Sequence, residues 1–331
     1  MKNSIPVKVV SVFCIVAMIF ALAVGLNFMM GTALAEKYNV GNAEIGEPVK
    51  NLEIDWTNGK VAIAYHSGNT VIISETADKT IKDSEKMRWL LDGDTLRIKY
   101  EKPGAFHLFS SLSKELTVTL PEGFAFDKAE IHATSGDLDI PAIQADKLEL
   151  KVTSGNIRAE VKARKIKANL TSGDMGIRIA EKADEIDASA TSGNITMEAV
   201  KADKVRIDTT SGDIRAAIKC ADGIRISSTS GSVDTVIGEA NKAEVETTSG
   251  KINVEAAALR ELAVRSTSGD VTALLPSEHG FTARVKTSSG DIEHQQALAK
   301  KDGVYVCGDG SGKVDIKTTS GDIAINILEK K

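Results

Sequence analysis

An acidic or amide side chain follows a glycine at regular intervals along much of this chain. Carboxylates stacked at such a spacing could chelate calcium, a hard cation that takes about six to eight oxygen ligands. The same side chains could instead accept a backbone N–H in their own turns. Asn and Lys interrupt the acidic series, and the nonapeptide pattern of calcium-binding β-rolls is absent. We therefore favour the turn role and predict no metal at these positions: Asp137, Asn156, Asp174, Asn194, Asp213, Ser232, Lys251, Asp270, Asp291 and Asp322.

Residues suited to catalysis are sparse and show no recognisable grouping. The histidines fall in unrelated contexts, with neither a His-Glu-x-x-His nor a Gly-x-Ser-x-Gly motif. Sugar sites usually need aromatic platforms, yet Phe281 and Tyr305 are the only aromatic residues after Asp127. We predict a protein that is not an enzyme and has no cofactor. The alternative is an enzyme acting on envelope polysaccharide, for which His279 and His294 would be examined first because they flank the longest insertions.

These polar residues belong to a repeat. The pair Ser-Gly, preceded by Thr or Ser, recurs at intervals of 19, 18, 20, 19, 19, 19, 19, 21 and 31 residues. A period this regular is the signature of a solenoid. Each glycine is expected at a turn that needs a positive φ or a close approach of adjacent rungs. The predicted turn glycines are Gly136, Gly155, Gly173, Gly193, Gly212, Gly231, Gly250, Gly269, Gly290 and Gly321.

One interval shows how a rung is built. After Gly212, apolar residues alternate with polar ones over Ile214–Ile218 and again over Ile224–Ser228. Lys219–Gly223, between them, is predicted to be a turn. Equivalent strands of successive rungs should pair in parallel, giving two facing sheets around a thin aliphatic core. The predicted fold is an all-β parallel β-solenoid with two strands in each rung of about 19 residues.

The repeat does not cover the whole chain. We predict a signal peptide or signal-anchor helix over residues 1–35, diverged leading rungs and a cap over 45–126, and the regular Thr-Ser-Gly-Asp solenoid over 127–330. A cap is expected because the first rung would otherwise expose its core and strand edges. Near the other end, Gln295–Lys301 is predicted to form a helical turn that projects from the stack. Ile323–Leu328 is predicted to be the last strand.

The N-terminus carries an export signal. Lys2 and Lys8 precede an apolar stretch over Val9–Met30, and Ala33-Leu34-Ala35 resembles a cleavage site. The stretch is also long enough to cross a bilayer, so cleavage and retention as an anchor both stay open. Either outcome places the rest of the chain outside the cytoplasm.

Two cysteines of the exported part, Cys220 and Cys307, lie about four rungs apart. At roughly 4.8 Å per rung that is about 20 Å, whereas a disulfide needs Cα atoms within about 7 Å. Both are predicted to be free thiols.

The repeated Thr-Ser-Gly-Asp columns resemble the bacterial DUF4097 family of β-strand repeat proteins, which are classed with adhesins. The resemblance covers roughly residues 45–330, from Ile-Asp-Trp-Thr-Asn-Gly to Lys-Thr-Thr-Ser-Gly-Asp-Ile. It implies a solenoid at the membrane exterior, and association with envelope stress in some relatives. The family supplies no catalytic or binding residues to carry over.

The function expected from these features is a non-enzymatic extracytoplasmic scaffold, an adhesin or an envelope-stress adaptor that binds a protein or an envelope component. A purely structural spacer is a further alternative. The formal net charge of −5, with both signs interspersed, gives no electrostatic footprint for nucleic acid. The membrane would be a partner only through an uncleaved N-terminal helix. The insertion near the C-terminus is the candidate partner loop: His294, Gln295, Gln296, Lys300 and Lys301.

Overall fold

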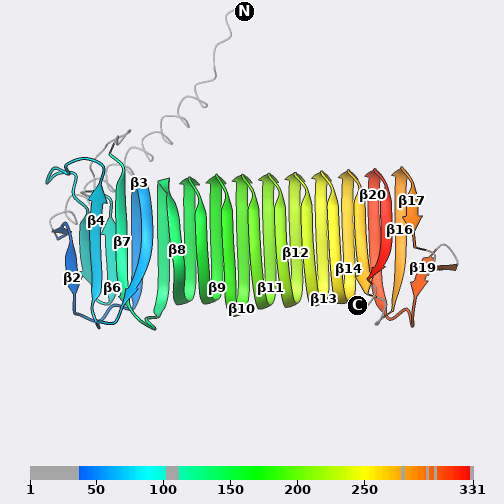
Figure 1. Cartoon of the computed structure of the whole chain (residues 1–331), viewed down its shortest axis with the longest axis horizontal. Helices are drawn as coiled ribbons and strands as arrows, with labels where there is room; N and C mark the ends of the chain where they lie inside the picture. The colour runs from blue at the N-terminus through cyan, green and yellow to red at the C-terminus, as the bar shows by residue number, and fades with distance from the viewer. Residues whose placement is uncertain (1–36, 102–111, 277–279, 296–297, 302–303, 329–331) are drawn as a thin grey trace, which may run out of the picture.

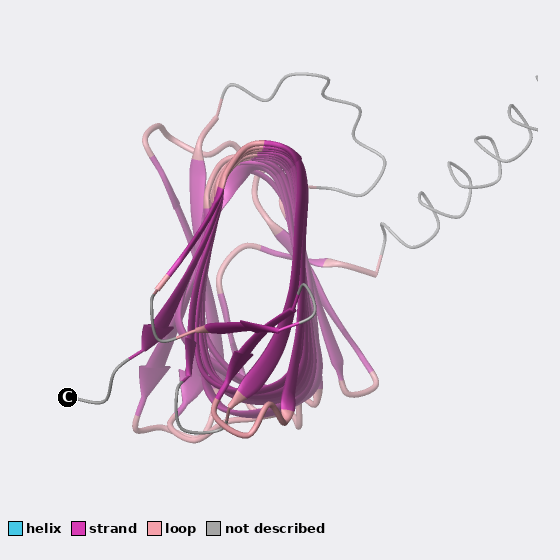
Figure 2. Ribbon diagram, turned by 90° about the vertical axis from the view of Figure 1, so that its right-hand side faces the viewer, coloured by secondary structure: helices cyan, strands magenta, loops and turns pink. Residues whose placement is uncertain are grey.

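The computed structural model describes residues 37–101, 112–276, 280–295, 298–301 and 304–328. Strands wind into a rod with a flattened oval section (Figures 1 and 2). The predicted N-terminal signal or anchor lies outside the described residues. Within them, no helix is long and apolar enough to span a membrane.

The middle of the rod is a stack of long strands. Neighbouring strands pair in parallel, as the repeat predicts, so that Ile214 lies beside Val233 and Val233 beside Ile252. Figure 1 shows these strands in sequence order from green to yellow. They are β8 (Phe126–Ser154), β9 (Ile157–Ser172), β10 (Met175–Ser192), β11 (Ile195–Ser211), β12 (Ile214–Ser230), β13 (Val233–Ser249) and β14 (Ile252–Ser268).

The rung differs from the expected strand–turn–strand in one respect. Backbone pairing continues through Lys219–Gly223, where Ala221 pairs with Ala240 and Gly223 with Lys242. Each rung is therefore one continuous strand that bends in the middle. Parallel pairing with the neighbouring rungs holds the bend in place. Its first half contributes to one face of the rod, which we call the first sheet, and its second half to the opposite face, the second sheet.

The core is a single column of small aliphatic side chains between the two sheets. In β12, Ile214, Ile218 and Ile226 are almost completely buried and alternate with exposed residues. Larger aromatic residues fill the two ends of the core: Trp56, Tyr100 and Phe126 at one end, Phe281 and Tyr305 at the other. Aliphatic side chains fill the narrow core of the middle rungs, which is why the middle of the sequence has no aromatic residues.

At the N-terminal end, strands do not stack in sequence order. The rung β3 (Asn51–His66) lies between β8 on one side and the pair β6 (Thr95–Lys99) and β7 (Lys114–Pro121) on the other. Antiparallel strands then cover this end: β4 (Val71–Ala77) pairs with β7, and β5 (Arg88–Asp92) with β6. The short β2 (Ala43–Ile45) and β1 (Asn39–Val40) pair with β4 and β5.

The C-terminal end repeats this device. From β15 (Val271–Pro276) the chain skips one position to form β16 (Phe281–Ser289) and β17 (Ile292–His294). It returns through the hairpin β18 (Ala299–Lys301) and β19 (Val304–Cys307). β20 (Gly312–Ser320) then fills the gap between β14 and β16, and β21 (Ile323–Leu328) lies between β15 and β17. In Figure 1 the red β20 accordingly precedes the orange β16.

Of two expectations for this end, the last strand was confirmed and the helical turn was wrong. Ile323–Leu328 is the last strand in sequence, but it lies inside the sheet because β17 pairs along its outer edge. Of the segment Gln295–Lys301 that we expected to project as a helical turn, Ala299–Lys301 instead forms β18, which pairs antiparallel with β19, and residues 296–297 lie outside the described residues. Leu298 and Tyr305 are each 3% exposed, so the hairpin lies across the end of the core (Figure 2). Burial of these apolar side chains favours a capping hairpin over a solvated helix.

Cys220 and Cys307 are free thiols, as predicted. Burial raises the pKa of the Cys307 thiol.

Candidate functional site

The turn glycines form a column along one edge of the rod. Gly212 has a φ of 139°, and a Cβ on it would lie 2.1 Å from the carbonyl oxygen of Gly193. A side chain there would meet both a disfavoured backbone region and the neighbouring rung. Gly321 stacks on Gly269, and Gly290 stacks on Gly321, following the inserted rung. Of the predicted set, Gly136 alone lacks the positive φ, although it makes the same close contact with Gly59, the glycine of the Asn-Gly pair in β3.

The acidic and amide side chains after these glycines form hydrogen bonds between rungs. Asp213 Oδ1 accepts the backbone N–H of Ser232 at 2.9 Å, and Asn194 Oδ1 accepts that of Asp213 at 2.9 Å. The role is the turn chemistry that we favoured, but the N–H comes from the next rung and not from the same turn. At the interruption, Lys251 forms an ion pair with Asp270 at 3.5 Å. No group of three or more His, Cys, Asp or Glu side chains that could hold a metal occurs among the described residues.

Hydroxyl groups before the glycines divide into a buried and an exposed set. Most of the buried set bonds glycine carbonyls of the neighbouring rung; Thr247 Oγ1, for example, lies 3.2 Å from Gly231 O. Ser266 Oγ is buried and has no such bond to any described residue. The next two positions, a Thr and a Ser, face solvent on successive rungs. The exposed Thr column consists of Thr134, Thr153, Thr171, Thr191, Thr210, Thr229, Thr248, Thr267 and Thr319, with Ser288 at the end. The rod thus presents a continuous row of hydroxyl groups.

The outer face of the first sheet contains a shallow hollow of about 590 Å³. Small or apolar side chains form part of its lining, including Ala217, Val236 and Leu274, and Arg215 and Glu255 add charge. Val236 is 50% exposed, which is unusual for a large aliphatic residue in this molecule. The hollow spans several rungs, so an extended ligand would contact equivalent positions repeatedly.

The predicted partner loop is held against the end of the rod. The His294 ring lies 4.8 Å from the Tyr305 ring, and Lys300 Nζ lies 5.3 Å from the centre of the Tyr305 ring. Gln295 Oε1 accepts the backbone N–H of Ile327 at 2.7 Å. Gln296 lies outside the described residues, as does His279, and for Lys301 only the backbone is described. His294, Gln295 and Lys300 therefore support the capping hairpin while His294 and Lys300 remain exposed.

Comparison with known proteins bears on this repeated architecture. The family model described as Toastrack DUF4097 matches residues 49–181 and 160–326. The chain belongs to the DUF4097 (Toastrack) family. No curated protein matches this DUF4097 chain.

Several solved structures are similar to this Toastrack chain. A protein described as a putative adhesin from Parabacteroides merdae is 11% identical, with a TM-score of 0.45, over 88% of this chain and 97% of that one. A putative adhesin from Parabacteroides distasonis is 13% identical, with a TM-score of 0.44 and the same coverage of 88% and 97%. A putative lipid binding protein from the same species is 17% identical, with a TM-score of 0.38 and again 88% and 97% coverage.

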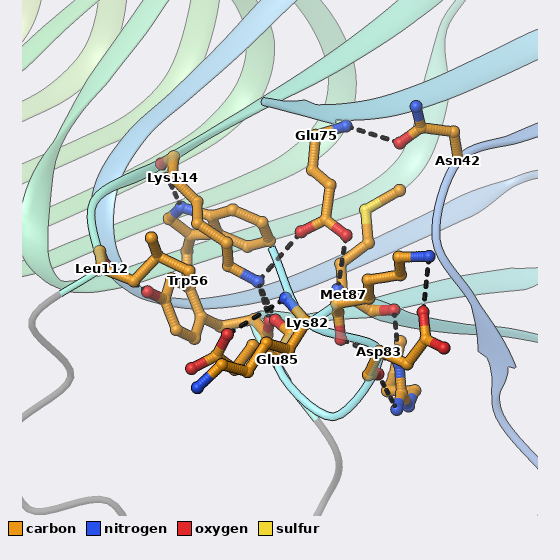
Figure 3. A network of polar contacts seen from close by, with 12 residues as sticks. Asn42, Trp56, Glu75, Lys82, Asp83, Glu85, Met87, Leu112 and Lys114 are labelled. Carbon is orange, nitrogen blue, oxygen red and sulfur yellow. Dashed lines mark hydrogen bonds and ion pairs between the residues drawn. The ribbon is translucent and has the colours of Figure 1, made fainter. Parts of the chain in front are cut away.

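Sequence reasoning missed a buried ion pair in the N-terminal end of the Toastrack rod (Figure 3). Lys114 Nζ lies 2.9 Å from Glu75 Oε2, and the two side chains are 0% and 4% exposed. Lys114 also donates to the carbonyl oxygens of Glu85, at 2.7 Å, and Tyr100. Glu75 Oε1 accepts the backbone N–H of Met87 at 2.7 Å. Burial lowers the pKa of Lys114, and the bond to Glu75 opposes that shift.

The aromatic rings of Trp56 and Tyr100 complete this site. Lys114 Nζ lies 5.1 Å and 4.0 Å from their ring centroids, and Trp56 Nε1 donates to Lys114 O at 3.0 Å. The pair joins β3, β4, β7 and the segment before β5. All three N–H donors of the Lys114 ammonium have an acceptor, so this buried charge can hold these elements together.

A second set of titratable side chains lies on the surface: Asp55 of β3, Lys99 of β6 and His132 of β8. Asp55 Oδ1 lies 3.5 Å from His132 Nδ1, and Asp55 Oδ2 lies 2.6 Å from Lys99 Nζ. The hydrogen bond with His132 is the main cause that lowers the pKa of Asp55, while that with Asp55 raises the pKa of His132.

Proposed function

We propose that this protein is a non-enzymatic scaffold on the outer side of the cell membrane, an adhesin or an envelope-stress adaptor that binds a protein or an envelope component. The observation that carries the proposal is the lateral surface: exposed side chains recur in register on successive rungs, in the Thr column and around Val236. Repeat proteins of this kind bind extended partners over wide, shallow surfaces.

The position of the acidic side chains supports a scaffold. Residues such as Asn194 and Asp213 hold neighbouring turns together through backbone N–H groups. Their carboxylate and amide oxygens therefore stabilise the stacking of the rungs.

Localisation outside the membrane rests on the N-terminal sequence, in which Lys2 and Lys8 precede the apolar stretch. A chain released by cleavage and a chain anchored by residues 1–35 would both present the same rod.

The capping hairpin is a second place where a partner could bind within the same function. His294 and Lys300 are exposed at the end of the rod, away from the lateral hollow. Deleting the hairpin would uncover Leu298 and the core beneath it, so point substitutions are the appropriate test.

The experiment is an affinity capture with the purified full-length chain as bait and solubilised membrane and cell-wall extract as prey. We compare the parent with Val236→Glu in the hollow and with the pair His294→Ala and Lys300→Ala at the hairpin. Capture that Val236→Glu abolishes places the partner on the lateral face, and capture lost with the hairpin pair places it at the end. No specific capture by the parent chain contradicts the proposal and favours a structural spacer.

A further inference from the structure

Three cations stack on the outer face of the second sheet near the C-terminal end. Arg265 of β14 pairs in register with Lys317 of β20, and Lys317 pairs with Lys286 of β16. All three side chains are exposed. The insertion of β20 between β14 and β16 is what makes this run, because Lys317 comes between two residues that precede it in sequence. Like charges directly opposite one another on neighbouring strands destabilise a sheet, so the arrangement has a cost without an anion.

Hydroxyl groups lie beside the cations. Two residues further along each strand, on the same face, are Thr267, Thr319 and Ser288. The cations and hydroxyls line a hollow of about 540 Å³, together with the carboxylate of Glu246. Lysine supplies a compact positive charge, arginine a planar fork of donors, and the hydroxyls further donors, which is a donor set suited to phosphate oxygens.

Nearby carboxylates leave a positive surplus. Arg265 lies 3.1 Å from Glu246 and Lys317 lies 2.7 Å from Asp315. Glu246 also pairs with Arg225, at 3.0 Å. Lys286 forms no ion pair with any of the described residues. Arg284, on the same strand, adds an exposed positive charge. The chain as a whole has a formal net charge of −5, so this concentration of cations is a local feature.

We propose that this hollow binds a phosphate group, with Arg265, Lys317 and Lys286 as its cations and Thr319 and Ser288 as hydroxyl donors. The inference rests on the proposed function only in taking the ligand from the envelope, and it names the chemical class of that ligand. The phosphate belongs to a soluble phosphate polymer or to a phospholipid headgroup, which share this chemistry. Because the hollow opens on a flat sheet, the bound group can be part of a longer molecule that follows the rod.

The test is isothermal titration calorimetry of the full-length chain with inorganic pyrophosphate as the probe. The variant Lys286→Gln with Lys317→Gln should weaken binding by about tenfold or more, because two charge-assisted contacts are lost. The matched control is Lys147→Gln with Lys165→Gln, a registered pair of exposed lysines on the same sheet with the same change in charge. It should change the affinity by less than about twofold, since exposed charges a Debye length or more away are screened.

A second variant tests the hydroxyls. Ser288→Ala with Thr319→Val keeps every charge and should weaken binding severalfold, by about the contribution of one or two hydrogen bonds. The proposal is overturned if the parent shows no saturable binding, or if both lysine pairs reduce binding equally. Circular dichroism of each variant verifies that the stack remains folded.

The two sources of phosphate are separated by repeating the comparison with long-chain polyphosphate and with phosphatidylglycerol–phosphatidylcholine vesicles. Greater affinity for the polymer identifies a soluble chain, and greater affinity for the vesicles identifies a headgroup. Envelope capture that persists without pyrophosphate binding overturns the phosphate site and leaves the proposed function standing. Pyrophosphate binding without envelope capture supports the site and contradicts the proposed function.

Discussion

Lys114 Nζ and Glu75 Oε2 lie 2.9 Å apart in a site from which solvent is excluded. Each charge is compensated by the other and by backbone groups of Tyr100, Glu85 and Met87. The pair therefore connects the antiparallel strands that cover the N-terminal end to the first rung of the rod.

We expect Lys114→Met to destabilise this end by about 3–5 kcal/mol, because it leaves the Glu75 carboxylate buried without its partner. The double variant Lys114→Met with Glu75→Leu should recover much of that loss, since no buried charge remains. Both tryptophans, Trp56 and Trp89, are in this region, so tryptophan fluorescence during urea unfolding reports on it. Circular dichroism reports on the whole stack in the same samples. A Lys114→Met chain as stable as its parent would contradict this role.

The repeat predicted the rung but not the order of the rungs. Apolar alternation in Ile214–Ile218 indicates strands, and the spacing of Gly212 and Gly231 indicates their parallel stacking. The stacking order of the rungs could not be predicted from the sequence, because equivalent strands are interchangeable. Lys313–Ser320 has nearly the same apolar pattern as Phe281–Ser289, so either could pair with β14. Local periodicity carries no information on which of two matching strands is the neighbour.

The buried pair did leave a signal in the sequence. Lys114 occupies the same alternation phase as Leu116 and Val118, and Glu75 that of Ile73. A charged residue in each of two inward phases predicts a buried pair. The partners are 39 residues apart, however, and only the antiparallel pairing of β4 with β7 brings them together.

Gly212→Ala should destabilise the rod by about 2 kcal/mol or more, because a side chain would be strained at its φ of 139° and would meet Gly193 O. Gly223 provides the matched control in β12, the strand that follows this turn: its φ is not in the positive range, and a Cβ there meets nothing within 4 Å. Gly223→Ala should be within about 0.5 kcal/mol of the parent. Thermal and urea unfolding measure both. Equal effects would mean that the turn glycine is not required.

Asp213→Ala should cost about 1 kcal/mol, because the backbone N–H of Ser232 loses its acceptor. Asp213→Asn keeps an oxygen at that position and should be close to neutral. Urea unfolding of the two variants decides the matter. If Asp213→Asn were as destabilising as Asp213→Ala, the negative charge would matter more than the hydrogen bond.

The His132–Asp55 contact predicts a pH dependence. Because Asp55 raises the pKa of His132, the associated stabilisation is complete below the unfolded pKa of about 6.5 and is lost as pH rises through the folded value. The lowered pKa of Asp55 acts at acid pH, where stability is lost as pH falls below about 4. Both groups are substantially exposed, so each effect should be well below about 1 kcal/mol.

Histidine NMR titration measures this directly. In the parent chain, the resonance that disappears in His132→Gln should titrate above about 6.5. Asp55→Asn should move that midpoint downward, and an unchanged midpoint would show that the Asp55 contact is absent in solution.

The position of β20 between β14 and β16 is tested most directly by engineered disulfides, and the phosphate site depends on it. With the three native cysteines replaced by alanine, Thr267→Cys is combined with either Thr319→Cys or Ser288→Cys. Adjacent rungs lie roughly 4.8 Å apart and alternate rungs about 10 Å, whereas a disulfide needs Cα atoms within about 7 Å. We predict that 267 cross-links to 319 and not to 288 under mild oxidation, as read by peptide mass mapping. A cross-link between 267 and 288, with none to 319, would show that the rungs stack in sequence order and would contradict the account.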